Sequence, residues 1–188
     1  RSLVGSEMCI RDSNWSTAAG GNIAQYSYWG GACQLWILEK ASDTKGTDIS
    51  LSANDLTYGN YTNAITTGSF TIGASSGKNV AVLNRNATVN GTSYSKVLQM
   101  NGGGNSTGRY IKFTATGACT VKVTAASTST SASRTLRLAS GSVGGSTVGN
   151  ATITGTPSTV TYKIPSAGTY YLYSTRSGIY VYQVNVAY

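Results

Sequence analysis

The stretch RYIKFTATGACTVKVTA, residues 109–125, decides the fold. Its first half places Ile111 and Phe113 on one side of an extended chain and Lys112 on the other, because successive side chains of a strand point to opposite faces. The second half repeats this alternation around Lys122, and a Gly-Ala step separates the two halves. The stretch therefore predicts two β-strands, each with an apolar face turned to a core and a basic side chain turned to solvent.

The same strand pattern recurs along most of the chain. Thr, Tyr and Gly are abundant while Leu and Glu are scarce, which favours β-structure over long helices. Strand-like runs separated by Gly, Ser and Asn span residues 69–74, 79–83, 95–100, 109–114, 119–125, 134–139, 159–164, 168–174 and 179–186. Eight or nine short strands with regular turns predict an all-β fold, an antiparallel β-sandwich of jelly-roll-like form.

The last run carries a local irregularity. Its apolar positions begin at Ile179 and Val181 and then shift phase to Tyr182 and Val184. A β-bulge near Tyr182 would reconcile the two phases and place this tyrosine in the core. Gly178, just before the run, is expected to serve the preceding turn.

Charge is distributed unevenly along the chain. Residues 56–188 contain no acidic residue and ten basic ones, namely Lys78, Arg85, Lys96, Arg109, Lys112, Lys122, Arg134, Arg137, Lys163 and Arg176. A surface of one sign favours polyanionic ligands and speeds their capture. The alternative is a merely solvated surface, and we assign Lys122 to it.

Missing residue types exclude several kinds of catalytic site. The chain has no histidine, and its last carboxylate side chain is Asp55. Residues 56–188 therefore cannot hold a Ser-His-Asp triad, a glycosidase carboxylate pair or a zinc ligand set. We expect neither catalysis nor a cofactor, while a structural calcium ion near Asp43, Asp48 and Asp55 stays open. Cys119, at a predicted strand start, is expected to be a small buried hydrophobic residue outside any disulfide.

The N-terminal residues follow another pattern. The longest apolar run near the start is Leu3–Val4, too short for a signal peptide or a membrane span. Residues 3–13, LVGSEMCIRDS, resemble the conceptual translation of a sequencing adapter. We therefore expect residues 1–13 to be non-native, and the natural sequence to be the C-terminal piece of a longer protein.

A short lectin-like segment follows, over residues 14–39. Its Gln34-x-Trp36 pair, preceded by an Asn-x-x-Gln-aromatic hairpin, resembles the last repeat of a ricin-type β-trefoil lectin. The resemblance makes Tyr26 or Tyr28 the sugar-stacking aromatic, whereas Cys33 replaces an asparagine that often contacts the sugar in that family. A short β-hairpin remnant is the expected structure. Residues 40–48 are polar and of mixed charge, which indicates a linker.

Three motifs span most of residues 49–188: TGRYIKFTATGACTVKVTAAS, SASRTLRLAS and GTYYLYSTRSGIYVYQVNV. They resemble a β-sandwich carbohydrate-binding-type module of secreted bacterial polysaccharide lyases and glycoside hydrolases, pectate lyases above all. The resemblance implies a secreted, non-catalytic module that targets a catalytic domain of the same chain to an acidic plant cell-wall glycan such as pectin.

The expected ligand contacts are arginines, lysines and tyrosines. An arginine fork binds a carboxylate through two parallel hydrogen bonds, and a tyrosine ring can lie against a sugar face. Core packing is the alternative role of each tyrosine. The candidate ligand-binding residues are Arg109, Arg134, Arg176, Lys112, Lys163, Tyr171, Tyr173 and Tyr180.

Two other functions stay open. The sandwich could be a spacer that docks on a neighbouring enzyme domain without binding glycan. Nucleic-acid binding follows from the charge alone and ranks last, because the basic residues are dispersed and no nucleic-acid motif is present.

Overall fold

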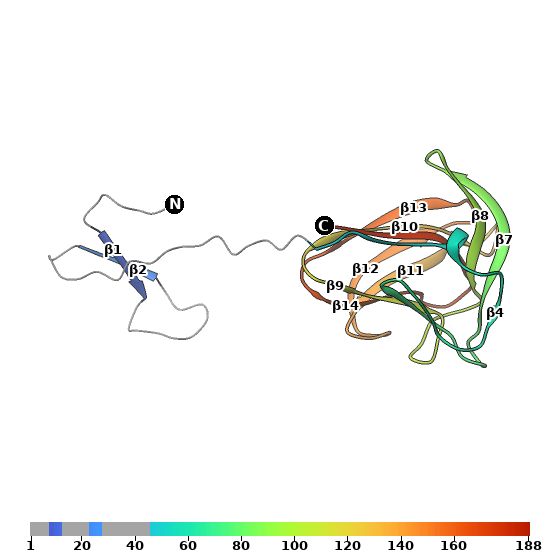
Figure 1. Cartoon of the computed structure of the whole chain (residues 1–188), viewed down its shortest axis with the longest axis horizontal. Helices are drawn as coiled ribbons and strands as arrows, with labels where there is room; N and C mark the ends of the chain where they lie inside the picture. Colours follow the sequence, from blue (N-terminus) through green and yellow to red (C-terminus); the bar gives the residue numbers. More distant parts are fainter. Residues whose placement is uncertain (1–7, 13–22, 28–45) are drawn as a thin grey trace. The chain divides into compact units, whose positions relative to one another are not determined.

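The computed structural model describes residues 46–188 and the backbones of two strands near the N-terminus (Figure 1). The chain divides into two compact units, residues 1–44 and 45–188. In the first unit β1 (Met8–Asp12) pairs antiparallel with β2 (Ile23–Ser27). β1 falls in the segment expected to be non-native. Most of the lectin-like segment, including Cys33, Gln34 and Trp36, and residues 40–45 of the expected linker lie outside the described residues.

The second unit consists of short strands, with one 3-10 turn, η2 (Ala53–Asp55), near its start. Among the described residues, no helix is long and apolar enough to cross a membrane. Its strands are β3 (Ile49–Ser52), β4 (Gly59–Tyr61), β5 (Ile65–Thr67), β6 (Phe70–Gly73), β7 (Val80–Val89), β8 (Thr92–Met100), β9 (Tyr110–Ala115), β10 (Cys119–Ser127), β11 (Arg134–Ser140), β12 (Ser146–Ile153), β13 (Ser158–Ile164), β14 (Gly168–Ser174) and β15 (Ile179–Ala187).

These strands form two antiparallel sheets that face each other (Figure 1). The seven-stranded sheet has the order β13-β10-β15-β8-β7-β4, with β3 also paired to β15, and the six-stranded sheet has the order β12-β11-β14-β9-β6-β5. The chain crosses between the sheets so that β8-β15-β10-β13 lies opposite β9-β14-β11-β12. This is the connectivity of an eight-stranded jelly roll, and it confirms the predicted fold class.

The core lies between the sheets and follows the alternation seen in the sequence. Ile111 and Phe113 of β9 and Val121 and Val123 of β10 are buried, whereas Lys122 points to solvent. One contiguous cluster joins apolar side chains from both sheets. Cys119 begins β10 and packs in this cluster as a buried thiol, which confirms its predicted burial. Burial raises the pKa of the Cys119 thiol.

A second, smaller cluster lies outside the main core, around Tyr182 of β15. The pairing of β15 with β10 shifts register at this residue, so the predicted bulge is confirmed. Tyr182 is fully buried, but it packs with Val97 and Ala126 in the second cluster and not between the sheets. Before this residue β15 pairs with β8, and after it with β3, so β8 separates from β15 here.

The β7–β8 hairpin covers this second cluster. Val89 and Tyr94, from the half of the hairpin near its turn, pack against Tyr182, and the Asn90 amide donates to the Thr159 hydroxyl of β13 at 3.5 Å. The half of the hairpin near its turn therefore bends across the outer side of β15 and β13, and Figure 1 shows this bend as a curve in β7 and β8.

All nine predicted strands are present, eight of them with shifted ends, and the structure adds others. β3, β4, β5 and β12 were not predicted, because they are short or, in β12, carry a glycine and mostly polar side chains. Gly178 lies between the bend at residues 175–177 and β15. A Cβ there would lie 2.6 Å from the Thr128 hydroxyl, so close packing and not a left-handed backbone requires the glycine.

Candidate functional site

The outer face of the six-stranded sheet brings three of the sequence candidates together. Lys112 of β9 pairs directly with Tyr171 of β14, and Thr71 of β6 lies beyond Lys112 in the same row. On the other side of β14, Tyr173 pairs with Arg137 of β11, and Arg137 pairs with Asn150 of β12. We call Tyr110, Lys112, Arg137, Asn150, Tyr171 and Tyr173 the outer-face cluster.

Two tyrosine rings in this cluster hold each other in place. Tyr110 and Tyr171 meet edge to face with their centroids 5.3 Å apart, a geometry that aromatic pairs prefer. The Tyr110 ring lies over Gly73 of β6, where a Cβ would overlap it. The glycine therefore allows the ring to lie against the sheet. Both rings are half-buried, which leaves part of each surface open to a ligand.

Arg137 is oriented by its neighbour on the edge strand. Its Nε donates to the Asn150 side-chain oxygen at 2.8 Å, and the remaining N–H groups of the guanidinium have no partner among the described hydrogen bonds. Lys112 lies two strands and two residues away, about 12 Å between Cα positions at ~4.8 Å per strand and ~3.3 Å per residue. Lys112 and Arg137 therefore lie on opposite sides of the Tyr110–Tyr171 pair.

Tyr173 is the member of the cluster that two loops cover. It is only 4% exposed, and its hydroxyl accepts a hydrogen bond from the Gly144 N–H at 3.1 Å. Gly104 covers the other side, since a Cβ there would lie 2.7 Å from the Tyr173 Cβ. Tyr173 therefore holds the loops 101–109 and 141–145 close to the outer face.

The three candidate arginines gather at one end of the same sheet. Arg109 immediately precedes β9, Arg134 begins β11, and Arg176 follows the end of β14. Because β14 runs antiparallel to both neighbours, its last residues lie beside the first residues of β9 and β11. We call Arg109, Arg134 and Arg176 the arginine end.

Each of these arginines has a different environment. Arg109 has a left-handed backbone, with φ of 62°, and its side chain donates to the Asn79 carbonyl at 3.2 Å and to the Asn79 amide oxygen at 3.4 Å. Arg134 donates from Nη1 to the Ser133 carbonyl at 3.0 Å, while its Nε is buried without a hydrogen-bond partner. Arg176 is exposed.

The last two candidates lie on the other sheet. Lys163 of β13 donates to the Thr120 hydroxyl at 2.9 Å on the outer face of the seven-stranded sheet. Tyr180 of β15 lies on that face too, where the Arg85 guanidinium stacks 4.5 Å from its ring centre. Lys122, assigned to solvent, is on the same sheet and is exposed. The structure therefore separates Lys163 and Tyr180 from the outer-face cluster.

Some residues of the cluster were not among the candidates. Tyr110 and Arg137 share the outward parity of Lys112 and Tyr171, so the alternation of β9 and β11 could have identified them. Asn150 could not be found this way, because β12 was not recognised as a strand. Arg85 is recognisable only once the fold brings it to Tyr180, which is far away in the sequence.

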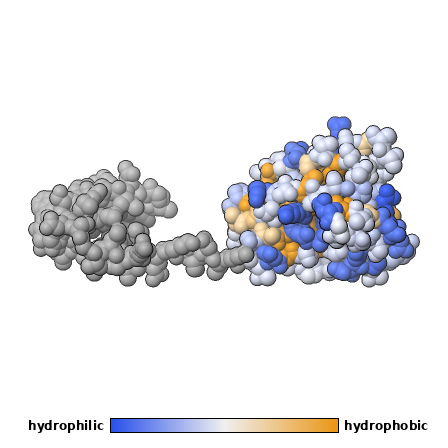
Figure 2. All heavy atoms as spheres, turned by 90° about the horizontal axis from the view of Figure 1, so that it is seen from above, coloured by the Kyte–Doolittle hydropathy of each residue, from blue (hydrophilic) through white to orange (hydrophobic). Residues whose placement is uncertain are grey.

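The charge of this unit remains one-sided in the structure. The carboxylates described in it are Asp48 and Asp55, and the Asp48 side chain accepts a hydrogen bond from the Tyr188 N–H at 3.0 Å. Within residues 46–188 and the two N-terminal strands, no three His, Cys, Asp or Glu side chains gather as a metal site would require. Asp43, part of the open calcium hypothesis, lies outside the described residues. Figure 2 shows one face of the unit, with hydrophilic side chains between small hydrophobic areas.

Comparison with known proteins gives structural likenesses only. No family model and no curated protein matches the chain. A protein described for glycan recognition by the Ruminococcus flavefaciens cellulosome is 14% identical, with a TM-score of 0.48 over 76% of this chain and 95% of its own. The xylan-binding domain CBM22-1 of Paenibacillus barcinonensis Xyn10C is 14% identical, with a TM-score of 0.48 over 74% and 92%. The C-terminal CBM6 of LamC from Zobellia galactanivorans is 9% identical, with a TM-score of 0.39 over 76% and 100%.

Proposed function

We propose that the β-sandwich, residues 49–188, is a non-catalytic module that binds an acidic polysaccharide of the polygalacturonate type on the outer-face cluster. The observation that carries the proposal is the placement of Lys112 and Arg137 on either side of the Tyr110–Tyr171 pair. An extended polymer that crosses β9, β14 and β11 would meet a cation, then tyrosine rings, then a second cation.

The chemistry of each group fits a uronate chain. Every unmodified galacturonate carries a carboxylate, and the free N–H groups of Arg137 can bind one through a charge-assisted fork. Lys112 supplies a point charge for a carboxylate of another sugar on the same chain. The exposed parts of Tyr110 and Tyr171 offer ring surface to sugar C–H groups and hydroxyls to sugar oxygens. With no carboxylate after Asp55, nothing on this sheet repels the polymer.

The arginine end would extend the same site. Arg176 is exposed at the end of β14, the strand that also carries Tyr171. Arg109 and Arg134 each use part of their donors on the protein itself, so they contribute mainly through long-range attraction. Lys163 and Tyr180 lie on the opposite sheet and are proposed as a separate, weaker contact.

The biological role follows from the domain organisation proposed for the chain. Residues 1–13 are non-native, residues 14–39 are a ricin-type remnant, and a polysaccharide-degrading domain precedes them in the natural, secreted protein. Tethering to the substrate raises the effective concentration of such a domain at the plant cell wall. The second candidate, a spacer without glycan affinity, is an outcome of the test below.

Affinity electrophoresis of the full chain tests the proposal. The net charge is +8, so the protein is run toward the cathode in native gels with polygalacturonate, methyl-esterified pectin, xylan or DNA. Lys112→Ala should weaken retardation by polygalacturonate about fivefold and Arg137→Ala about tenfold, because each removes a charge-assisted contact. Arg137→Lys keeps the charge but loses the fork, and it should stay several-fold weaker than the wild type.

Lys122→Ala is the matched control. It removes the same charge as Lys112→Ala but from the opposite sheet, and it should change retardation less than about twofold. Equal losses in the two lysine variants, together with equal retardation by DNA, would mean nonspecific charge attraction. No retardation by any of the glycans would support the spacer function instead.

A further inference from the structure

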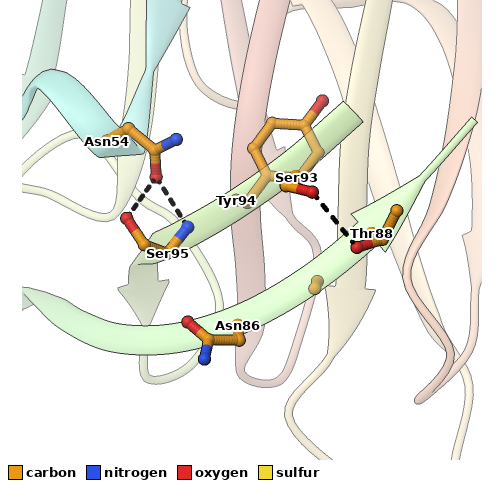
Figure 3. A pocket seen from close by; sticks show the side chains of 7 residues that line it. Asn54, Asn86, Thr88, Ser93, Tyr94 and Ser95 are labelled. Carbon is orange, nitrogen blue, oxygen red and sulfur yellow. Dashed lines mark hydrogen bonds between the residues drawn. The ribbon is translucent and has the colours of Figure 1, made fainter. Parts of the chain in front are cut away.

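An open groove on the β7–β8 hairpin lies away from the outer-face cluster. Its volume is about 540 Å³, within the range of small-molecule sites. The lining comes from η2, β7 and β8 and is made of Asn54, Asn86, Ala87, Thr88, Ser93, Tyr94 and Ser95 (Figure 3). None of these side chains is charged, although the surrounding unit is strongly basic. The groove therefore offers hydrogen bonds without a net charge.

Asn54 is fixed so that its amide donor is free. Its side-chain oxygen accepts from the Ser95 N–H at 2.9 Å, the Ser95 hydroxyl at 3.2 Å and the Lys96 N–H at 3.0 Å. Figure 3 shows the two bonds to Ser95. The oxygen is thus saturated, and the two N–H donors of the same amide have no partner among the described hydrogen bonds. The Lys96 ammonium binds the Asn54 carbonyl at 3.1 Å, which fixes the backbone of this residue as well.

The bulge in β7 directs the side chains of two adjacent residues, Arg85 and Asn86, to different surroundings. The pairing of β7 with β8 skips from Asn84 to Ala87, which leaves Arg85 and Asn86 outside the ladder. The Arg85 side chain turns toward β15, where its Nε donates to the Tyr182 hydroxyl at 3.2 Å. Asn86 lines the groove and is exposed. The positive charge of the bulge is therefore directed away from the groove, and an amide is directed to it.

Hydroxyl groups and a rigid floor complete the groove. Thr88 and Ser93 pair directly across the hairpin, with their hydroxyl oxygens 3.4 Å apart (Figure 3). Tyr94 is buried beneath, where its hydroxyl donates to the Gln183 side-chain oxygen at 2.7 Å and its ring packs on Tyr182. Because the floor is anchored in the second cluster, the groove is formed before a ligand arrives, which lowers the entropic cost of binding.

We propose that this groove is a second carbohydrate site, specific for a neutral glycan chain and not for a uronate. Amide donors and paired hydroxyls match the vicinal hydroxyls of a neutral sugar, which both donate and accept. A carboxylate would find neither an arginine nor a lysine in the lining. The groove shares no residue with the outer-face cluster, so the proposal for either site can be refuted without affecting the other.

Nuclear magnetic resonance of the full chain labelled with ¹⁵N tests this site. Cellohexaose, xylohexaose and mannohexaose are titrated separately, with trigalacturonate as the acidic comparison. At least one neutral hexasaccharide should shift the backbone amides of residues 86–95 and the side-chain amides of Asn54 and Asn86. The affinity should change little with salt, because no charge is neutralised on binding.

Two variants and one control decide the assignment. Asn86→Ala removes an exposed amide without a described structural contact, and Asn54→Asp keeps the accepting oxygen but removes the donor. Each should weaken neutral binding about tenfold or more, while Lys112→Ala should leave it unchanged. The proposal is overturned if none of the three hexasaccharides shifts the groove amides, if the shifts fall only on β9, β11 and β14, or if Asn86→Ala binds like the wild type.

Discussion

Tyr182 gives the sharpest test of how the β7–β8 hairpin is held. Its side chain is fully buried in the second cluster, and its ring lies 5.4 Å from that of Tyr94. Replacement by alanine removes about 150 Å² of buried surface, or about 4 kcal/mol at ~25 cal/mol per Å². Large-to-small changes of buried aromatic residues cost about 3–5 kcal/mol, and the value worked out for Tyr182→Ala falls within this range.

Tyr182→Phe is the matched variant. It keeps the ring and loses only the hydrogen bond from the exposed Arg85 side chain, so we expect a cost of about 0.5–1 kcal/mol. Urea unfolding followed by far-UV circular dichroism measures both variants. With an m-value of about 2 kcal/mol per molar urea, Tyr182→Ala should lower the midpoint by about 2 M.

Hydrogen exchange shows where the energy is lost. If the hairpin depends on Tyr182, amides of β7 and β8 beyond the bulge should exchange faster in Tyr182→Ala while those of β9 and β14 keep their protection. A cost below about 1 kcal/mol for Tyr182→Ala, or equal costs for the alanine and phenylalanine variants, would refute the packing argument. Loss of neutral-glycan binding together with hairpin protection would connect the second cluster to the groove.

Three further predictions concern the sheets and their turns. Burial raises the pKa of Tyr162, whose hydroxyl donates to the Leu136 carbonyl across the core, so the stability that this side chain contributes is complete below about pH 10 and falls at higher pH. In urea unfolding, the free energy of unfolding should fall less from pH 8 to pH 11 in Tyr162→Phe than in the wild type, and an equal fall would contradict the assignment. Gly73→Ala should displace the ring of Tyr110 and weaken polygalacturonate binding about threefold or more, as measured by affinity electrophoresis; unchanged retardation would exclude that ring from the site. Gly178→Ala should lower the free energy of unfolding by about 1–3 kcal/mol because its Cβ would crowd Thr128, whereas Gly77→Ala, with open space around it, should leave stability unchanged or raise it slightly. Thermal unfolding compares the two variants, and similar melting temperatures would argue against close packing at Gly178.

The alternation of side chains predicted much of the architecture. In RYIKFT and CTVKVTA it identified two strands and the direction of each side chain, because a period of two is a local property of an extended chain. The phase shift in β15 predicted the bulge at Tyr182 for the same reason. β12 escaped this reasoning, since an edge strand with a glycine and polar side chains has no clear alternation.

Location on one sheet or the other could not be read from alternation. Lys112 and Lys122 have the same outward parity in consecutive strands, yet they lie on opposite sheets, because the chain passes from one sheet to the other between β9 and β10. The hairpin groove was also outside the reach of sequence reasoning. Asn54 and Ser95 are 41 residues apart, and their contact arises only where β8 separates from β15.

The sequence by itself thus determined the all-β class, the buried faces of β9 and β10 and the one-sided charge of residues 56–188, all of which depend on local order or composition. Tertiary structure alone decided which charges share a surface. Strand order placed Lys112, Tyr171 and Arg137 on one face and assigned Lys163 and Tyr180 to the other. The physical reason is that hydrogen-bonded neighbours in these sheets come from distant parts of the chain, so a shared binding face is a property of the pairing and not of the residue pattern.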